Sequence, residues 1–167
     1  VTPADSVIES NFIIANYNSQ EAIDNDDCSE YMEHRYNFFV YGQSGLKSYF
    51  GGHDIASHDN IYAFTIGHCV NIGFGHETFL PGHEDTFANN TCIMKQSGPY
   101  LKMGCSGGTL PTLGNNAVHD PEPERGMTLC GANFSSWVKS GRDNGTTLSA
   151  WPPAAEIVSA ATRLLGM

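Results

Sequence analysis

The sequence predicts an all-β protein, a right-handed parallel β-helix of about five coils with a C-terminal capping helix. The first observation is an asparagine that recurs before short apolar runs, at intervals of 26, 23, 30 and 26 residues. The second is a charged fraction of 16%, which is low beside the roughly 25% of ordinary globular proteins. The third is the glycine that marks the turns between these runs. A period of this length is that of one β-solenoid coil.

The recurring residues are Asn11, Asn37, Asn60, Asn90 and Asn116. Asparagine tolerates the left-handed backbone of a sharp turn, and its side-chain amide can hydrogen-bond between stacked coils. We therefore expect Asn37, Asn60 and Asn90 at equivalent turns, buried and hydrogen-bonded. A β-sandwich would also place turns about every 8–12 residues, but it gives no reason for one residue type to recur.

The repeat stops near Cys130, so we assign the coils to residues 1–130 and a C-terminal loop and helix to residues 131–167. Residues 133–151 are predicted to be an irregular loop. Pro152 and Pro153 favour the start of a helix. The apolar positions after them form one stripe: Ile157, Ala161, Leu164 and Leu165. We expect this helix to cover the exposed core of the last coil.

No comparable helix precedes the first strand, which is expected over residues 7–14. An uncovered coil end would expose Phe12 and Ile14 together with unpaired strand edges. We therefore expect an upstream solenoid segment or a partner chain to pack against this end.

The five cysteines and the glycosylation motifs favour an extracellular protein. Cys105 leads into the last weak coil and Cys130 leaves it, which predicts a disulfide between them. Acceptor motifs for N-glycosylation lie at Asn89, Asn133 and Asn144. No run approaches the roughly 18 apolar residues of a membrane span. A net charge of −10 with eight basic residues argues against a nucleic-acid partner.

The asparagine-plus-apolar coils, over about residues 5–120, resemble the repeats of pectate-lyase-like extracellular β-helix proteins. Such coils occur in polysaccharide lyases, glycoside hydrolases, epimerases and non-catalytic surface proteins. The resemblance therefore implies a fold and a polysaccharide or glycan partner, but no single activity.

Asp26-Asp27-Cys28 resembles the acidic motif of the polygalacturonase family, in which a Gly-His segment lies on the next coil. Here Gly52-His53 follows Asp27 by about one coil. The resemblance implies that Asp26 and Asp27 are a catalytic carboxylate pair, as glycoside hydrolysis requires, and that His53 supports them. The basic motif of that family has no clear match, because Lys47 precedes the histidine instead of following it. Lys47 is the candidate for binding substrate beside this motif.

The same acidic segment has two other interpretations. It is either a solvated turn or a calcium site built from Asp24, Asp26 and Asp27, because calcium prefers carboxylate oxygens. The cofactor prediction is accordingly none, or calcium.

Two histidines share a position in the repeat. His53 and His83 each lie seven residues before their asparagine, follow a glycine and precede an acid. Equivalent positions in a solenoid stack about 4.8 Å apart. We therefore expect Glu30, His53 and His83 in one column, with Asp54 and Glu84 in the next.

Such a column would bind substrate, hold a metal ion, exchange protons in catalysis, or serve as a polar ladder at a turn. Our functional hypothesis is an extracellular carbohydrate-active β-helix that acts on polysaccharide glycosidic bonds, as a hydrolase or a lyase. The alternative is a non-catalytic structural or glycan-binding domain of a larger cell-surface or matrix protein.

Overall fold

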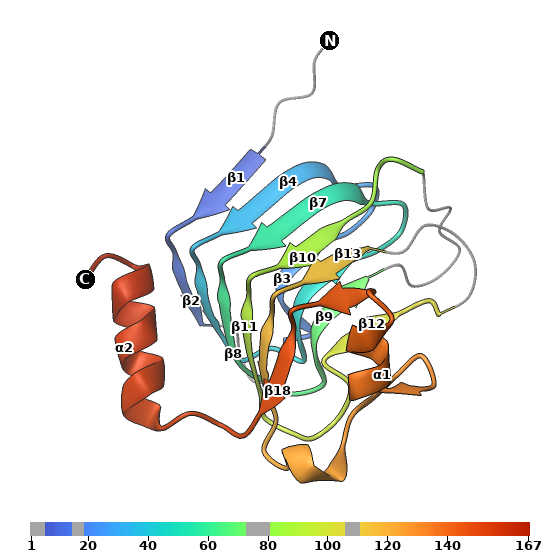
Figure 1. Ribbon diagram of the computed structural model, residues 1–167. Coiled ribbons are helices and arrows are strands. Elements are labelled where there is room, and N and C mark those ends of the chain that lie inside the picture. Colours follow the sequence, from blue (N-terminus) through green and yellow to red (C-terminus); the bar gives the residue numbers. More distant parts are fainter. Residues whose placement is uncertain (1–5, 15–18, 73–80, 106–110) are drawn as a thin grey trace.

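The computed structural model describes residues 6–14, 19–72, 81–105 and 111–167, and its fold is a parallel β-solenoid of about five turns (Figure 1). The predicted fold class is confirmed. Three sheets form the faces of the solenoid, and every neighbouring pair of strands within them is parallel. Each turn of the chain contributes one strand to a sheet and then moves to the next sheet.

The strands have the following bounds. Sheet A contains β1 (Ser6–Glu9), β4 (Glu30–Arg35), β7 (His53–His58), β10 (Thr86–Ala88), β13 (Thr112–Gly114) and β17 (Asp143–Asn144). Sheet B contains β2 (Phe12–Ile14), β5 (Phe38–Val40), β8 (Ile61–Thr65), β11 (Thr91–Met94), β14 (Ala117–His119) and β18 (Thr147–Ser149). Sheet C contains β3 (Glu21–Asn25), β6 (Ser44–Ser48), β9 (His68–Ile72) and β12 (Leu101–Met103).

The core is a set of stacked side-chain columns. In sheet B the inward column is Phe39, Tyr62, Cys92 and Val118, each of which is fully buried. The rings of Phe39 and Tyr62 stack with their centroids 4.9 Å apart, close to the spacing of adjacent strands. Because side chains alternate along a strand, the neighbours of these residues face outward.

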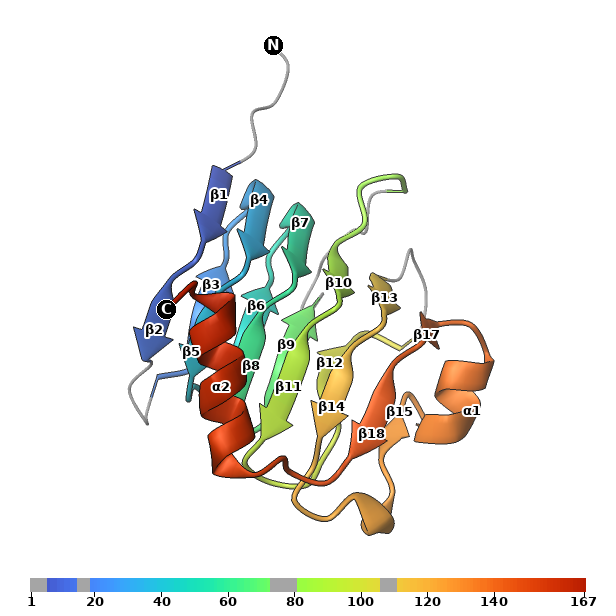
Figure 2. The ribbon, with the colours of Figure 1, turned by 60° about the vertical axis from the view of Figure 1, so that its left-hand side comes forward.

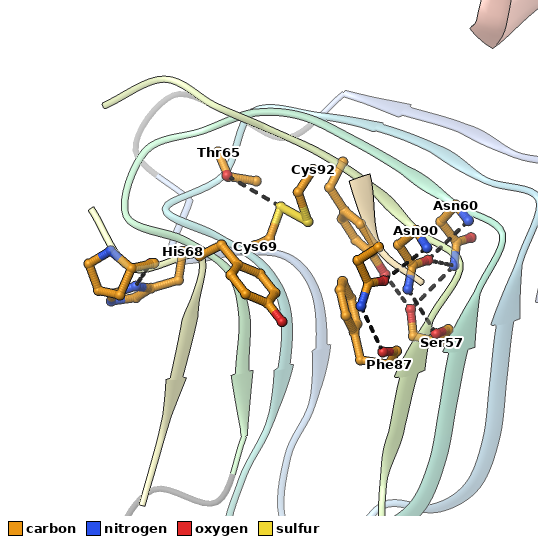
Figure 3. The surroundings of a disulfide bond; sticks show 12 residues. Ser57, Asn60, Thr65, His68, Cys69, Phe87, Asn90 and Cys92 are labelled. Atoms are coloured by element: carbon orange, nitrogen blue, oxygen red, sulfur yellow. Dashed lines mark hydrogen bonds between the residues drawn. A yellow bond between two sulfur atoms is a disulfide. The ribbon is translucent and has the colours of Figure 1, made fainter. Parts of the chain in front are cut away.

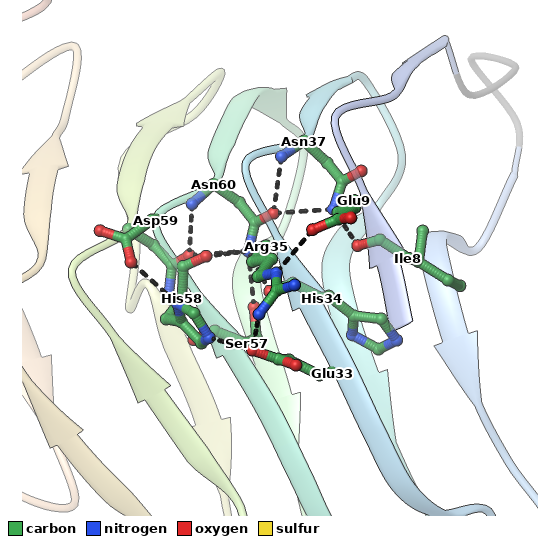
Figure 4. Close-up of polar contacts among 11 residues, drawn as sticks. Ile8, Glu9, Glu33, His34, Arg35, Asn37, Ser57, His58, Asp59 and Asn60 are labelled. Carbon is green, nitrogen blue, oxygen red and sulfur yellow. Dashed lines mark hydrogen bonds and ion pairs between the residues drawn. The ribbon is translucent and has the colours of Figure 1, made fainter. Parts of the chain in front are cut away.

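The asparagines form a ladder between sheets A and B (Figures 3 and 4). Asn37 N–H donates to Asn60 Oδ1 over 2.9 Å, and Asn60 N–H donates to Asn90 Oδ1 over 3.0 Å. Asn37, Asn60 and Asn90 are all buried. The predicted asparagine ladder is therefore confirmed.

The left-handed backbone, however, falls on the residue before each asparagine. The values of φ lie between 55° and 57° at Ser10, Tyr36, Asp59, Asn89 and Asn115. The expectation that the asparagines themselves turn the chain is wrong. Their role is to accept the N–H of the equivalent residue in the preceding turn.

The segment predicted as an irregular loop is ordered, and this part of the prediction is wrong. It contains the short helix α1 (Phe134–Lys139) and strands β17 and β18, which pair with β13 and β14. At this level Thr146 replaces asparagine, and its hydroxyl accepts the N–H of Asn116 over 3.0 Å. Two solenoid strands thus lie within the predicted C-terminal segment 131–167.

The C-terminal helix α2 (Ala154–Leu164) exists, but it does not cover the last coil. Ile157 packs against Ile61, Ala63 and Ile93, the outward-facing residues of β8 and β11. Figure 2 shows α2 lying over the strands of sheet B. The end of the solenoid is closed instead by the hairpin of β15 (Thr128–Leu129) and β16 (Ala132–Asn133) and by α1. These elements supply Leu129 and Trp137 to the core. The predicted capping role of α2 is therefore wrong.

Two disulfides join successive turns. The predicted Cys105–Cys130 bond is present, and a second bond joins the buried residues Cys69 and Cys92 (Figure 3). Cys28 is free and exposed. No helix within the described ranges is long and apolar enough to cross a bilayer.

Apolar side chains are exposed at the first turn. Val7 is 43% exposed, Phe12 56% and Ile14 62%. Phe12 stacks on Phe38 with the ring centroids 5.3 Å apart, on the outer face of sheet B rather than in the core. A partner chain or upstream segment that covers this end stays a prediction.

Candidate histidine–carboxylate site on sheet A

Three successive turns bring acidic and histidine side chains together where sheet C leads into sheet A. Glu30 opens β4 and His53 opens β7, and the two residues are paired in register. His83 precedes β10, the next strand of the sheet (Figure 1). The predicted alignment of Glu30, His53 and His83 over successive turns is confirmed.

Asp54 is the centre of this cluster. Its Oδ2 lies 2.7 Å from Nδ1 of His53 and 2.7 Å from Nδ1 of His83. On the opposite side of the His53 ring, Nε2 lies 3.0 Å from Oε2 of Glu30. The imidazole rings of His53 and His83 meet edge to face with their centroids 5.3 Å apart. One carboxylate thus holds two imidazoles, and a second carboxylate holds the far side of one of them.

The backbone explains why adjacent residues can point the same way. Asp54 and Tyr31 occupy equivalent positions in successive turns, and both have a φ of 54°. In a regular strand His53 and Asp54 would project from opposite faces of the sheet. The left-handed residue interrupts this alternation, so both side chains lie outside. The Asp54 N–H also donates to the carbonyl of His83 over 3.3 Å.

The cluster has a shielded centre and an open rim. The side chains of His53 and Asp54 are 18% and 24% exposed, whereas those of His83 and Glu30 are 45% and 55% exposed. The shielded pair is joined by a hydrogen bond, while the rim is accessible to a ligand from solvent.

Two carboxyl groups here have opposite electrostatic environments. Burial would raise the pKa of Asp54, but hydrogen bonds from His83 and His53 lower it below its usual value. Asp85 is buried and accepts the Ile55 N–H over 2.9 Å, and burial raises its pKa. Neighbouring carboxyls with diverging pKa values are typical of sites that transfer protons. Sequence reasoning missed Asp85, although it directly follows the predicted residue Glu84.

Glu84 directly follows His83 in the chain. Its Oε1 accepts a hydrogen bond from Gly82 N over 2.9 Å, so its carboxylate turns back on its own loop. The column of Asp54 and Glu84 stays a prediction.

The predicted acidic segment lies at the same corner of the solenoid. Asp26 and Asp27 are in the turn between β3 and β4, and the N–H of Cys28 donates to the carbonyl of Phe50 in the next turn. The His53 N–H likewise donates to Ser29. Gly52-His53 thus follows the acidic turn by one coil, as expected.

The acidic side chains, however, face a lysine. Lys47 Nζ lies 2.8 Å from Oδ2 of Asp26 and 3.2 Å from Oδ2 of Asp24. Lys47 is buried, and although burial opposes its charge, the hydrogen bonds to Asp26 and Asp24 raise its pKa. A calcium ion at Asp24 and Asp26 would have to displace the Lys47 ammonium. A substrate that binds Lys47 would have to break both of these ion pairs. Asp27 is exposed in the turn.

A second histidine cluster lies at the other end of β7 (Figure 4). His58 Nδ1 contacts Asp59 over 2.8 Å and its Nε2 contacts Glu33 over 2.9 Å, while Arg35 joins Glu33 to Glu9. Burial would lower the pKa of His58, but the hydrogen bonds to Asp59 and Glu33 raise it. Sequence reasoning found no register for His58, although it pairs with Arg35 one turn earlier.

The three predicted glycosylation residues, Asn89, Asn133 and Asn144, are all exposed. Asn133 also accepts the Ser136 N–H over 2.9 Å and so caps helix α1. Glycan attachment stays a prediction at each of them.

Comparison with known protein families, curated proteins and solved structures finds no match to this chain.

Proposed function

We propose that this chain is an extracellular, carbohydrate-active β-solenoid that acts on polysaccharide glycosidic bonds, with the cluster of Glu30, His53, Asp54 and His83 as its reaction centre. The observation that carries the proposal is the carboxylate of Asp54 shared by two imidazoles. A carboxylate that accepts Nδ1–H orients a histidine and leaves its Nε2 available for proton transfer. His83 has this arrangement, and its side chain is the more exposed of the two imidazoles.

The proposed binding surface for a polymer is the outer face of sheet A. Beside the cluster this face carries small side chains, Ala56, Thr86 and Ala88, in register on β7 and β10. His53 and His58 border it at the two ends of β7, five residues and therefore on the order of 16 Å apart. Small side chains between polar groups suit a chain of hydroxyl-rich sugars better than a small apolar ligand.

The extracellular location is part of the same proposal. Two disulfides and exposed glycosylation motifs are typical of proteins that fold in an oxidising compartment. A polysaccharide of a cell wall, matrix or surface would be met there. The resemblance of the coils to pectate-lyase-like proteins agrees with this substrate class.

The test is a turnover assay of the purified chain on a panel of neutral and acidic polysaccharides. New reducing ends would report hydrolysis, and unsaturated sugar products would report elimination. We expect Asp54→Asn and His83→Gln to lower turnover at least 100-fold, the lower end of what general acid–base catalysis contributes. His119→Gln, on sheet B, should leave turnover unchanged.

Asp27→Asn separates this proposal from the alternative centre in the acidic turn. Retained turnover in Asp27→Asn, with loss in Asp54→Asn, is the expected pattern. The opposite pattern would move the reaction to the acidic turn. Polysaccharide binding without any turnover would instead favour the non-catalytic glycan-binding domain.

A further inference from the structure

We propose that the same cluster binds one divalent transition-metal ion, zinc by the chemistry of its ligands, through His53 Nδ1, His83 Nδ1 and Asp54 Oδ2. The ligand atoms of these three residues all lie within 4.8 Å of one another. This geometry alone supports binding of the ion. Its part in glycosidic chemistry rests on the proposed function, in which the ion would replace the Nδ1–H hydrogen bonds to Asp54 as the group that holds both imidazoles.

The spacing of the ligand atoms is close to that of a tetrahedral zinc site. Zinc bonds to nitrogen and oxygen measure about 2.0–2.1 Å, so tetrahedral ligand atoms lie roughly 3.3–3.4 Å apart. Each Nδ1 now lies 2.7 Å from Asp54 Oδ2, with a proton between them. An ion that replaces these protons needs each Nδ1 to move about 0.6–0.7 Å away from Oδ2. It also needs the two Nδ1 atoms, which now lie within 4.8 Å of each other, to be roughly 3.3–3.4 Å apart. Rotation about the side-chain torsions of the exposed His83 would provide this movement.

Glu30 completes the arrangement from outside. A histidine that ligates a metal through one ring nitrogen nearly always donates its other N–H to a carboxylate or carbonyl, which fixes the ring. His53 Nε2 lies 3.0 Å from Glu30 Oε2, on the side of the ring that faces away from Asp54. The metal site therefore gives the Glu30 carboxylate a specific role that a polar ladder would not require.

The ligand set selects the ion. Two imidazoles and one carboxylate suit zinc and its neighbours, whereas calcium takes about 6–8 oxygen ligands and magnesium keeps an octahedral shell of oxygens. Three protein ligands leave a fourth position, as in catalytic rather than structural zinc sites. His83 is on the open rim, so that position faces the outer surface of sheet A. Zinc lowers the pKa of a bound water to about 7 and would supply hydroxide beside a bound polysaccharide.

The test uses the full chain carrying Cys28→Ser, because an exposed thiol can bind zinc by itself. After chelation and removal of the chelator, zinc is titrated by calorimetry, and cobalt is titrated while the visible absorption of tetrahedral cobalt is recorded. We expect one ion per chain, no comparable binding of calcium or magnesium, and a tetrahedral cobalt spectrum.

Variants assign the ligands. Asp54→Asn and His83→Gln should abolish the cobalt spectrum, and asparagine tolerates the left-handed backbone at position 54, so the fold is retained. Glu30→Gln should weaken binding about 10- to 100-fold, the usual effect of losing an outer carboxylate. His58→Gln, which alters the other histidine–carboxylate cluster, should bind zinc as the parent chain does. Absence of zinc binding by the parent chain, or binding unchanged in Asp54→Asn and His83→Gln, would overturn the inference.

Turnover separates this inference from the proposed function. If the chelated chain cleaves polysaccharide at the untreated rate, the metal has no part in the reaction and the proposed function stands. If zinc binds as described but no polysaccharide is bound or cleaved, the metal site stands and the proposed function fails.

Discussion

Lowering the pH from about 7.5 to about 4 should destabilise the folded chain by roughly 3 kcal/mol through His34 alone. His34 lies in the inward column of sheet A between Ile8 and Ser57 and is fully buried. Neither of its ring nitrogens hydrogen-bonds within the part of the chain that the structure describes. Burial therefore lowers the pKa of His34 to about 4.

The folded chain loses stability at low pH because its His34 binds a proton less readily than the same residue in the unfolded chain. In the unfolded chain histidine has a pKa of about 6.5. Between this pH and the folded pKa of about 4, the unfolded state binds a proton at His34 and the folded state does not. The contribution is fully present above pH 6.5 and is lost as the pH falls towards the folded pKa of about 4.

Urea unfolding of the parent chain and of His34→Leu across this pH range is the measurement. The variant should be at least as stable at neutral pH, because it removes an unpaired buried polar group. The difference in free energy of unfolding between His34→Leu and the parent chain should then grow by about 3 kcal/mol, in favour of the variant, as the pH falls towards 4. His68→Leu, at the surface of sheet C, should follow the parent curve. Parallel curves for the parent chain and His34→Leu would show that His34 is not buried in its neutral form.

Asn60→Ala should lower the free energy of unfolding by about 3 kcal/mol, the upper end of the range for buried groups left unpaired. The Asn60 amide donates to the carbonyls of His34 and His58 over 2.8 and 2.9 Å. Its Oδ1 accepts the N–H of Asn37. Alanine removes all of these partners at once, in a site from which water is excluded.

The chain supplies two matched controls for Asn60→Ala. Thr146 takes the place of asparagine in the last turn, where its hydroxyl accepts the N–H of Asn116. Asn60→Thr should therefore recover part of the lost stability, because it restores an acceptor. Asn11→Ala, at the exposed first step of the ladder, should cost well under half as much. Equal losses in Asn60→Ala and Asn11→Ala would contradict the buried-ladder account.

The repeat could be predicted because each coil repeats the same physical requirement. An acceptor must meet the N–H of the equivalent residue one turn earlier, and asparagine does so at four successive steps. Where Thr146 serves the same purpose with a different residue type, the periodicity was lost and β17 and β18 were missed.

The position of α2 could not be predicted from its apolar stripe. The stripe shows that one side of the helix is buried, but it does not say against which surface. The outward-facing residues Ile61, Ala63 and Ile93 of sheet B form an apolar surface that can bury such a stripe as well as the open end of the core could. The hairpin and α1 already close the end of the solenoid, so α2 covers the side of sheet B.

The candidate site was predicted in part because stacking follows from the register. Glu30, His53 and His83 were identified from their distance to the asparagines. The central role of Asp54 depends on its left-handed backbone, which directs it to the same side as His53. A regular alternation would have placed it on the opposite face. The sequence offers Lys47 only as the nearest basic residue to the acidic motif. Its ion pairs with Asp24 and Asp26 cross between turns, so sequence spacing does not show them.

The most direct test of the central claim is to observe the histidine side chains while polysaccharide fragments are added. In nitrogen–proton NMR spectra of the imidazoles, we expect the signals of His53 and His83 to shift on addition of a fragment of the substrate polysaccharide. The signals of His68 and His119, on sheets C and B, should stay in place. The same additions to Asp54→Asn should produce much smaller shifts, because the carboxylate that holds both rings is gone. Unchanged His53 and His83 signals with a fragment that binds elsewhere on the chain would contradict the account.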